Sequence, residues 1–476
     1  VLTGDEITAL GYNSMIDALR TMPSVAVSNN GGAGKVSTLR IRGEDGYRTL
    51  VLMDGIDISD TSGPQFSPRM DQMLSSGIER IEVLRGPQGL MYGADAGGVV
   101  NISTTSPGDG YSGVLSAEGG RYGTSQLAAN LGYGGETVDG NLSITDFDTD
   151  GFNTRSDDIV PGDDDGYDNS TYHARLGWTI NDDLRLALVG RDVDSESEYD
   201  NCYNASFMPT NLCHSTFEQQ AWRASANYSS ASFTHELAYS ESSTESENFS
   251  EGVFAFGGEG DLEKWSYLGS FRGSDALRLV YGAEFRSESR DDSGVDQERD
   301  QDGYDLEYQG DFSERFYLTA GVRYDDNDDF GDHTTYRVSG AYLIPLSGGE
   351  LKLRGAYGTG FRAPSLYEVA YNNAPWGNGV VLDAEESDGY DLAVSWYGDS
   401  GLYLEAVYFD QTIDQEIYFD LVTSSGYLQG GDDSSSSGVE LIASWPVLES
   451  LSLTGNYTYN DTENADGDTR SRRPEH

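Results

Sequence analysis

Apolar and polar residues alternate along most of this chain from about residue 111 onward. Leu184, Leu186 and Leu188 fall on one face of an extended segment, and Arg185 falls on the other. The segment 451–459 repeats the pattern, with leucine and tyrosine on one face and serine, threonine and asparagine on the other. Side chains of a β-strand point to opposite faces with a period of two. This alternation predicts transmembrane β-strands with lipid outside and water inside.

The connections between these strands support an antiparallel membrane barrel. Short turns are expected at Gly134–Gly135, Asn181–Asp183, Gly273–Asp275, Ser347–Gly349 and Gly398–Gly401. Between them we expect long polar loops at roughly 146–168, 194–216, 242–260, 288–303, 361–385 and 421–437. Barrels of the outer membrane place short turns at the periplasmic end and long loops outside. We predict roughly seventeen strands here, of the about 22 that a complete plugged barrel has.

The first 107 residues follow a different pattern. Helical spacing near the start is followed by short strand-like runs at Thr38–Ile41, Thr49–Met53 and Arg80–Leu84. Turns rich in glycine and aspartate separate these runs, which is typical of a small α+β domain. We therefore predict two domains, residues 1–107 and residues 108–476.

Composition and charge narrow the class of protein. Of the 476 residues, 37% are hydrophobic, and no run approaches the roughly 18 apolar residues of a transmembrane helix, which excludes a helical membrane protein. The net charge of −52 makes nucleic acid an improbable partner, because phosphate binding needs clustered lysine and arginine. The acidity fits either a solvated surface or a saline, cation-rich setting, and the sequence leaves both open.

The two cysteines, Cys202 and Cys213, lie eleven residues apart in a predicted polar loop. A disulfide between them suits an oxidising compartment such as the periplasm or the cell exterior. Two unpaired thiols are the alternative.

Several motifs occur in an order that identifies a family. In the first domain they are Leu39–Gly43, Val51–Gly55 and Ile78–Ile102; in the second they are Gly358–Glu368, Glu385–Ser387 and Gly438–Glu440. Together they resemble the plug and barrel of TonB-dependent outer-membrane transporters of the cobalamin and ferric-siderophore type. The resemblance implies that the first domain sits inside the barrel lumen. It also implies that this sequence is a fragment lacking both ends of such a protein.

The resemblance and the strand alternation together suggest how plug and barrel are held. Arg42 and Arg85 lie in the plug, and Glu386 and Glu440 lie on strands where alternation is expected to point them inward. Because a guanidinium can grip carboxylates bidentately, we expect these four residues to form an ionic lock. Four ordinary solvated charges are the alternative.

Ligand contacts are expected on three plug loops, Glu44–Arg48, Ser59–Ser67 and Tyr92–Gly97. Their aromatic and hydrogen-bonding side chains suit a ring-shaped or chelated ligand, and the alternative is that they are plain turn residues. The candidates are Tyr47, Arg48, Gln65, Phe66 and Tyr92.

The acidic loops suggest a calcium-binding site, because calcium prefers six to eight oxygen ligands on flexible loops. Their layout resembles the calcium-binding loops of the cobalamin-transporting branch, although a merely acidic exposed loop is the alternative. The candidate ligands are Asp148, Asp150, Asp163, Asp165, Asp192 and Asp194.

The family resemblance implies import of cobalamin or a ferric siderophore through the outer membrane of a Gram-negative bacterium. The periplasmic protein TonB, with ExbB and ExbD, would supply energy from the proton gradient. We expect a monomer that contacts the lipid bilayer and lipopolysaccharide, requires no cofactor except possible calcium, and is not an enzyme. The alternatives are a passive surface protein such as a calcium-dependent adhesin, and an outer-membrane enzyme.

Overall fold

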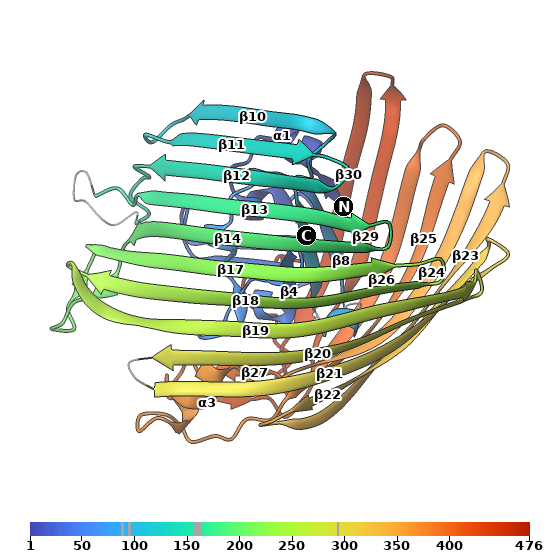
Figure 1. Cartoon of the computed structure of the whole chain (residues 1–476). Coiled ribbons are helices and arrows are strands. Elements are labelled where there is room, and N and C mark those ends of the chain that lie inside the picture. The colour runs from blue at the N-terminus through green and yellow to red at the C-terminus, as the bar shows by residue number, and fades with distance from the viewer. Residues whose placement is uncertain (87–89, 94–96, 156–162, 293–294) are drawn as a thin grey trace.

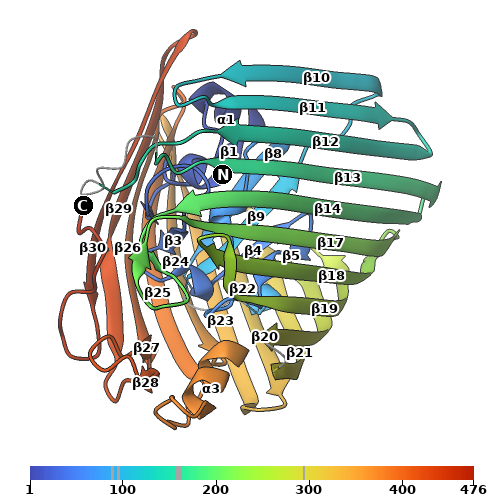
Figure 2. The ribbon, with the colours of Figure 1, turned by 90° about the vertical axis from the view of Figure 1, so that its left-hand side faces the viewer.

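The computed structural model describes residues 1–86, 90–93, 97–155, 163–292 and 295–476. A small α+β domain lies on the concave side of one large, strongly curved antiparallel sheet (Figures 1 and 2). This arrangement confirms the predicted plug and membrane β-barrel architecture. The chain passes from one part to the other between Thr104, which ends β9, and Gly110, which begins β10.

The plug is built on a five-stranded sheet in the order β1-β8-β9-β4-β5. Neighbouring strands are antiparallel except β4 and β9, which run parallel. The plug helices are α1 (Gly4–Leu10), α2 (Met15–Leu19) and the 3-10 turns η1 (Gly46–Arg48), η2 (Met70–Gln72) and η3 (Leu90–Tyr92). Its strands are β1 (Leu2–Thr3), β2 (Val25–Asn29), β3 (Ser37–Ile41), β4 (Thr49–Met53), β5 (Ile56–Asp57), β6 (Ser59–Asp60), β7 (Ser67–Pro68), β8 (Ile78–Arg85) and β9 (Gly98–Thr104).

The plug has its own apolar core. Met15, Leu19, Ile41, Ile81 and Ile102 are fully or almost fully buried in it. The main apolar cluster therefore belongs to the plug, and the barrel face that surrounds it is mainly polar. Among the residues that the structure describes, the barrel contributes Val189 and Ala221 alone to the buried members of that cluster.

The large sheet contains seventeen strands among the described residues, as predicted. Each strand pairs antiparallel with the next strand of the sheet. The strands are β10 (Gly110–Gly119), β11 (Ser125–Gly134), β12 (Val138–Thr149), β13 (Tyr167–Asn181), β14 (Leu184–Tyr199), β17 (Cys213–Ser229), β18 (Phe233–Ser250), β19 (Val253–Ser274), β20 (Leu277–Asp292), β21 (Val295–Phe312), β22 (Phe316–Asn327), β23 (Gly331–Leu346), β24 (Gly349–Arg362), β25 (Glu385–Gly398), β26 (Tyr403–Asp414), β29 (Ser434–Leu448) and β30 (Leu451–Glu463).

Strand alternation places polar side chains inside and apolar ones outside. On β13, Asn169, Thr171 and His173 are buried against the plug, whereas Tyr172 and Trp178 are exposed on the outer face. A strand in a barrel shows this division when one face meets lipid and the other meets a wet lumen. Among the described residues, none of the helices is long and apolar enough to cross a membrane.

The five predicted short turns all lie at one end of the sheet. At the other end, the connection after β24 carries α3 (Leu366–Asn373), and those after β14 and β26 carry small hairpins. These hairpins are β15 (Cys202–Tyr203) with β16 (Pro209–Thr210) and β27 (Ile417–Phe419) with β28 (Tyr427–Gln429).

Two predicted long loops are wrong. Residues 242–260 lie mostly within β18 and β19, and residues 288–303 lie mostly within β20 and β21. These strands contain 18, 22, 16 and 18 residues. A tilted membrane strand needs only about 9–11 residues, so their far ends extend well beyond the lipid. Both faces of a strand are polar there, because the inner face contacts polar groups of the plug and the outer face lies beyond the lipid, so the composition resembles that of a loop.

Candidate functional site at the plug and barrel interface

The plug is joined to the barrel wall by an ion-pair cluster around Glu440 of β29. Arg42 follows β3 in a left-handed conformation (φ 54°), and Gly43 continues this turn. The Arg42 guanidinium donates from Nε to Glu440 Oε1 at 2.9 Å and lies 2.6 Å from Asp391 Oδ1. Arg85, at the end of β8, donates to Glu440 Oε2 at 2.6 Å. The Glu440 side chain is completely buried, so these contacts are shielded from water.

Three of the four expected lock residues therefore lie in contact, and the fourth does not. Glu386 is on the outer face of β25, where its side chain is 70% exposed and lies 3.8 Å from His333. The expectation that Glu386 points inward is wrong because the residue has the opposite strand parity. Asp391, five positions later on the same strand, reaches Arg42 instead.

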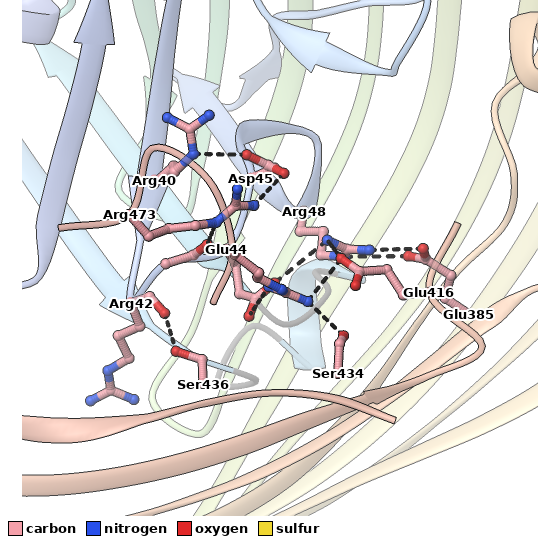
Figure 3. Close-up of polar contacts among 12 residues, drawn as sticks. Arg40, Arg42, Glu44, Asp45, Arg48, Glu385, Glu416, Ser434, Ser436 and Arg473 are labelled. Carbon is pink, nitrogen blue, oxygen red and sulfur yellow. Dashed lines mark hydrogen bonds and ion pairs between the residues drawn. The ribbon is translucent and has the colours of Figure 1, made fainter. Parts of the chain in front are cut away.

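A second ion-pair cluster surrounds Arg48, which ends η1 in the plug (Figure 3). Arg48 Nη2 lies 2.7 Å from Glu385 Oε1, and Arg48 Nη1 lies 3.4 Å from Glu416 Oε1. Within the plug, Arg48 also pairs with Glu44 at 3.5 Å. Burial favours a neutral guanidinium, but these carboxylates outweigh it and raise the pKa of Arg48 well above its ordinary value. The side chain therefore stays charged.

Residues of three barrel connections complete the second cluster. Arg362, at the end of β24, donates to Glu385 at 2.7 Å and to Glu368 of α3 at 3.0 Å. After β30, Arg470 donates to Glu44 at 3.1 Å and to Glu416 at 2.8 Å. The segment Glu44–Arg48 is thus fixed by side chains far away in the sequence. This cluster joins the plug to the connections that follow β24, β26 and β30.

Tyr47 and Arg48 occupy the cluster rather than a free surface. Two guanidinium groups lie over the Tyr47 ring, Arg48 at 4.8 Å and Arg362 at 4.9 Å from its centroid. Arg48 is fully buried. These two predicted ligand-binding residues therefore hold plug and barrel together, and a ligand could reach them only after the cluster opens.

The other predicted ligand-binding residues are distributed over two places. Phe66 is half-buried under the Arg286 guanidinium, which lies 4.4 Å from its ring centroid, and Gln65 beside it is also half-buried. Tyr92 is exposed on η3, on the side of the plug that contacts β21–β24. The rest of the predicted loop Tyr92–Gly97 includes residues 94–96, which lie outside the described residues.

Hydrogen bonds from barrel strands hold the plug loop between β6 and β7. Thr244 Oγ1 of β18 donates to Asp60 at 3.1 Å, and Arg290 Nε of β20 donates to the Ser62 carbonyl at 3.1 Å. Ser365, the N-cap of α3, donates to the Pro64 carbonyl at 3.0 Å. Thr244 and Arg290 lie on strands where we expected loops, so strand parity could not be used to predict these contacts.

A third tie joins the turn between β4 and β5 to the barrel. His173 Nε2 and Asp54 Oδ2 are 2.8 Å apart, and Arg175 Nη1 lies 3.3 Å from the same carboxylate. Asp54 also accepts a hydrogen bond from the Thr104 amide at 3.1 Å. His173 and Arg175 belong to the alternate residues of β13 that point into the lumen, so strand alternation could have identified them.

The predicted calcium ligands do not converge. Asp148, Asp150 and Asp194 are exposed, and Asp163 and Asp192 are half-buried. Asp165 is buried, where it accepts hydrogen bonds from the amide and hydroxyl of Thr154. Within the described ranges, no group of three or more histidine, cysteine, aspartate or glutamate residues is placed to hold a metal ion. The loop segment 156–162 lies outside the described residues.

The structure joins Cys202 and Cys213 in a disulfide, as expected. The bond closes the loop that carries β15 and β16, at the end of the sheet opposite the short turns.

Comparison with known proteins agrees with this architecture. Residues 1–100 match the family described as TonB-dependent Receptor Plug Domain, and residues 95–476 match TonB dependent receptor-like, beta-barrel. The chain is 32% identical over 406 residues to the vitamin B12 transporter BtuB of Photobacterium profundum, covering 83% of this chain and 63% of that protein. It is 26% identical over 496 residues to the vitamin B12 transporter BtuB of Vibrio cholerae, covering 100% of this chain and 77% of that protein.

Among solved structures, the ferric enterobactin receptor of Pseudomonas aeruginosa superposes with a TM-score of 0.81 at 17% identity. The match covers 98% of this chain and 80% of that one. Likeness at this identity shows the fold alone. The chain spans 63% of the length of the Photobacterium protein, which is less than two thirds.

Proposed function

Because this chain belongs to the family of TonB-dependent receptors, we propose that it imports a scarce ligand across the outer membrane of a Gram-negative bacterium. The proposed driving force is the proton gradient of the inner membrane, transmitted by TonB together with ExbB and ExbD. The relatives named as vitamin B12 transporters support cobalamin as the ligand. A ferric siderophore is the alternative ligand.

The observation that carries this proposal is the way the plug is held. Ion pairs at Glu440 and around Arg48 join the plug to the barrel wall, and nearly all their side chains are buried. Breaking a buried ion pair by removing one partner costs about 3–5 kcal/mol. For a ligand to pass the plug, these contacts must therefore be broken, and breaking them costs free energy. An energised partner in the periplasm can supply that work, whereas a passive pore or adhesin would have no use for it.

The recognition surface that we propose lies on the plug loop between β6 and β7. Gln65 and Phe66 are half-buried there, and Phe66 stacks under Arg286. Binding pockets for small molecules combine apolar faces with a few fixed polar groups, which this pair provides. Tyr47 and Arg48 take the further role of joining the ligand-binding side to the barrel.

Calcium binding to the acidic loops after β12 and β14 is a separate proposal. Its support is the density of carboxylates alone, since the described aspartates are not gathered around one point. Calorimetry with the full-length protein should show heat of binding at millimolar calcium. Absence of that heat would dispose of calcium without affecting the import proposal.

Growth rescue tests the ligand directly. The complete protein is expressed in a host that lacks its own cobalamin and siderophore receptors, and cobalamin or single iron chelates are supplied one at a time. We expect growth with limiting cobalamin. Growth only with a ferric siderophore would correct the ligand, and growth with neither would reject import of both classes.

A further inference from the structure

An exposed apolar patch lies at the tips of two neighbouring hairpins, far from the short turns of the barrel. Its members are large apolar side chains, each more than half exposed, in a chain of net charge −52. We call this set the hairpin-tip patch: Tyr203, Phe207, Met208, Leu212, Val253, Phe254 and Phe256. Contiguous exposed apolar residues of this kind mark interaction sites more often than isolated ones do.

The two hairpins are fixed to each other. The Glu251 amide, in the turn between β18 and β19, donates to the Leu212 carbonyl at 2.8 Å. Asn204 Nδ2 donates to Glu251 Oε1 at 3.2 Å. Figure 1 shows the loop after β14 beside the turn between β18 and β19, at the left-hand edge of the sheet. The two connections that carry the patch are therefore held side by side.

The loop that carries half of the patch is held in shape before any partner binds. The disulfide Cys202–Cys213 closes it, and β15 pairs with β16 inside it. At its tip, Phe207 is 86% exposed and adopts a left-handed conformation with φ 57°. A bulky residue rarely adopts this conformation, and such strain persists only where surrounding contacts enforce it. Preorganisation of this kind lowers the entropy cost of association.

The second hairpin presents its apolar residues on both faces. Every residue from Val253 to Phe256 at the start of β19 is exposed, although successive side chains point in opposite directions. A hairpin tip that stands free in this way can enter a concave partner. Aromatic residues and methionine, which dominate the patch, are enriched at protein interfaces.

Acidic side chains surround the patch. Glu198, Glu251 and Glu259 are exposed on the three strands or turns next to it. At the base of the loop, Arg155 donates to Asn201 at 3.1 Å and to Asn211 at 3.4 Å. A partner that covers the apolar centre must therefore meet a mainly negative rim.

We propose that the hairpin-tip patch is a docking site for a basic polypeptide that places apolar side chains against the patch and lysine or arginine against its rim. Charge complementarity selects this occupant, since it accelerates encounter and excludes wrong partners. A second copy of the chain would bring an equal negative charge to the same rim. An anionic membrane surface would meet the same repulsion. This docking is separate from cobalamin import and uses no residue of the plug.

The test uses the full-length protein in detergent and three synthetic peptides of equal length. The first peptide contains leucine, tryptophan and lysine, the second replaces lysine with glutamate, and the third replaces the apolar residues with serine. Binding is measured by fluorescence anisotropy for the wild type and for the triple variant Phe207→Ser, Phe254→Ser, Phe256→Ser. The matched control is Leu421→Ser with Val422→Ser, an apolar pair that is at least as exposed and lies on the connection carrying β27 and β28.

We expect the lysine and tryptophan peptide to bind the wild type and the control alike, and the triple variant at least about tenfold more weakly. The glutamate and serine peptides should bind all three proteins weakly. Equal affinity of wild type and triple variant for the first peptide would overturn the proposal, as would equal binding of the lysine and glutamate peptides. Self-association in sedimentation, or flotation with anionic lipid vesicles, that the triple variant loses would assign the patch to another occupant and also overturn it.

Discussion

The neighbouring glutamates of β25 offer a sharp test of the plug contacts. Glu385 and Glu386 have the same chemistry and adjacent positions, yet they point to opposite faces of the sheet. Glu385 is buried against the Arg48 cluster, whereas Glu386 is 70% exposed on the outer face. Replacing each with glutamine therefore compares an interior charge with an exterior one at nearly constant sequence and strand context.

The structure sets the magnitude. Glu385 accepts from Arg48 Nη2 at 2.7 Å, from Arg362 Nε at 2.7 Å and from the Ile417 amide at 2.5 Å. Glutamine keeps one acceptor oxygen but turns an amide toward groups that are themselves donors. Glu44 and Glu416 still neutralise Arg48, so the loss belongs at the lower end of the range for a broken buried pair, about 3 kcal/mol. For Glu386→Gln we expect a change within about 0.5 kcal/mol.

Hydrogen exchange of plug amides measures this difference. In Glu385→Gln, protection of the segment 44–53 should fall by roughly a hundredfold, because about 1.4 kcal/mol corresponds to a factor of ten in the opening equilibrium. In Glu386→Gln the same amides should exchange as in the wild type. Equal protection in both variants, or a larger loss in Glu386→Gln, would refute the assignment of Glu385 to the plug interface.

Three further expectations concern the other contacts. Glu440→Gln should leave the Arg42 and Arg85 guanidiniums without their shared carboxylate, which lowers the free energy of detaching the plug by about 3–5 kcal/mol. The urea concentration at the midpoint of detachment should fall accordingly, and an unchanged midpoint would contradict this. Burial lowers the pKa of Lys35 to about 8 from its ordinary value of 10.5, despite nearby carboxylates. The folded protein then binds fewer protons than the unfolded one between these values, so stability should rise from pH 8 to 10.5, and Lys35→Met should abolish that rise in unfolding experiments. Reducing the disulfide Cys202–Cys213 should expose its loop to protease without changing cobalamin uptake, and loss of uptake would show that the loop takes part in import.

The architecture could be predicted from the sequence because a strand that contacts lipid on one face must place apolar residues at every second position, and this alternation is visible in the sequence. Leucine and tyrosine can face lipid only on alternate positions, so the approximate number of strands and five of the short turns could be predicted without coordinates. Long strands above the lipid escaped this reasoning. At 242–260 the inner face of the hairpin carries polar residues that contact the plug and the outer face is polar as well, so no contrast between faces remains to reveal a strand.

The interface was predicted in part, and the errors have identifiable causes. Arg42, Arg85 and Glu440 were found because the family motifs bracket them. Glu386 is wrong as a lock residue, since Leu392 and Val394 share its parity and point to lipid, and Asp391 was not among the expected residues. Following that parity back along β25 would have corrected the choice.

The role of Arg48 could not be predicted from local sequence. Glu385, Glu416 and Arg470 approach it from connections that lie more than three hundred residues away. The alternation of apolar and polar residues does not indicate which loops fold back over the plug. The same limit applies to Tyr47, because the Arg362 guanidinium that covers its ring comes from a distant part of the sequence.

Uptake of labelled cobalamin by cells that express the complete protein tests the central claim most directly. The measurement is made in two hosts that differ only in the presence of TonB. We predict accumulation in the host that has TonB and only surface binding in the host that lacks it. Equal accumulation in both hosts would mean that ligand passes the ion-paired plug without external work, which would contradict the account.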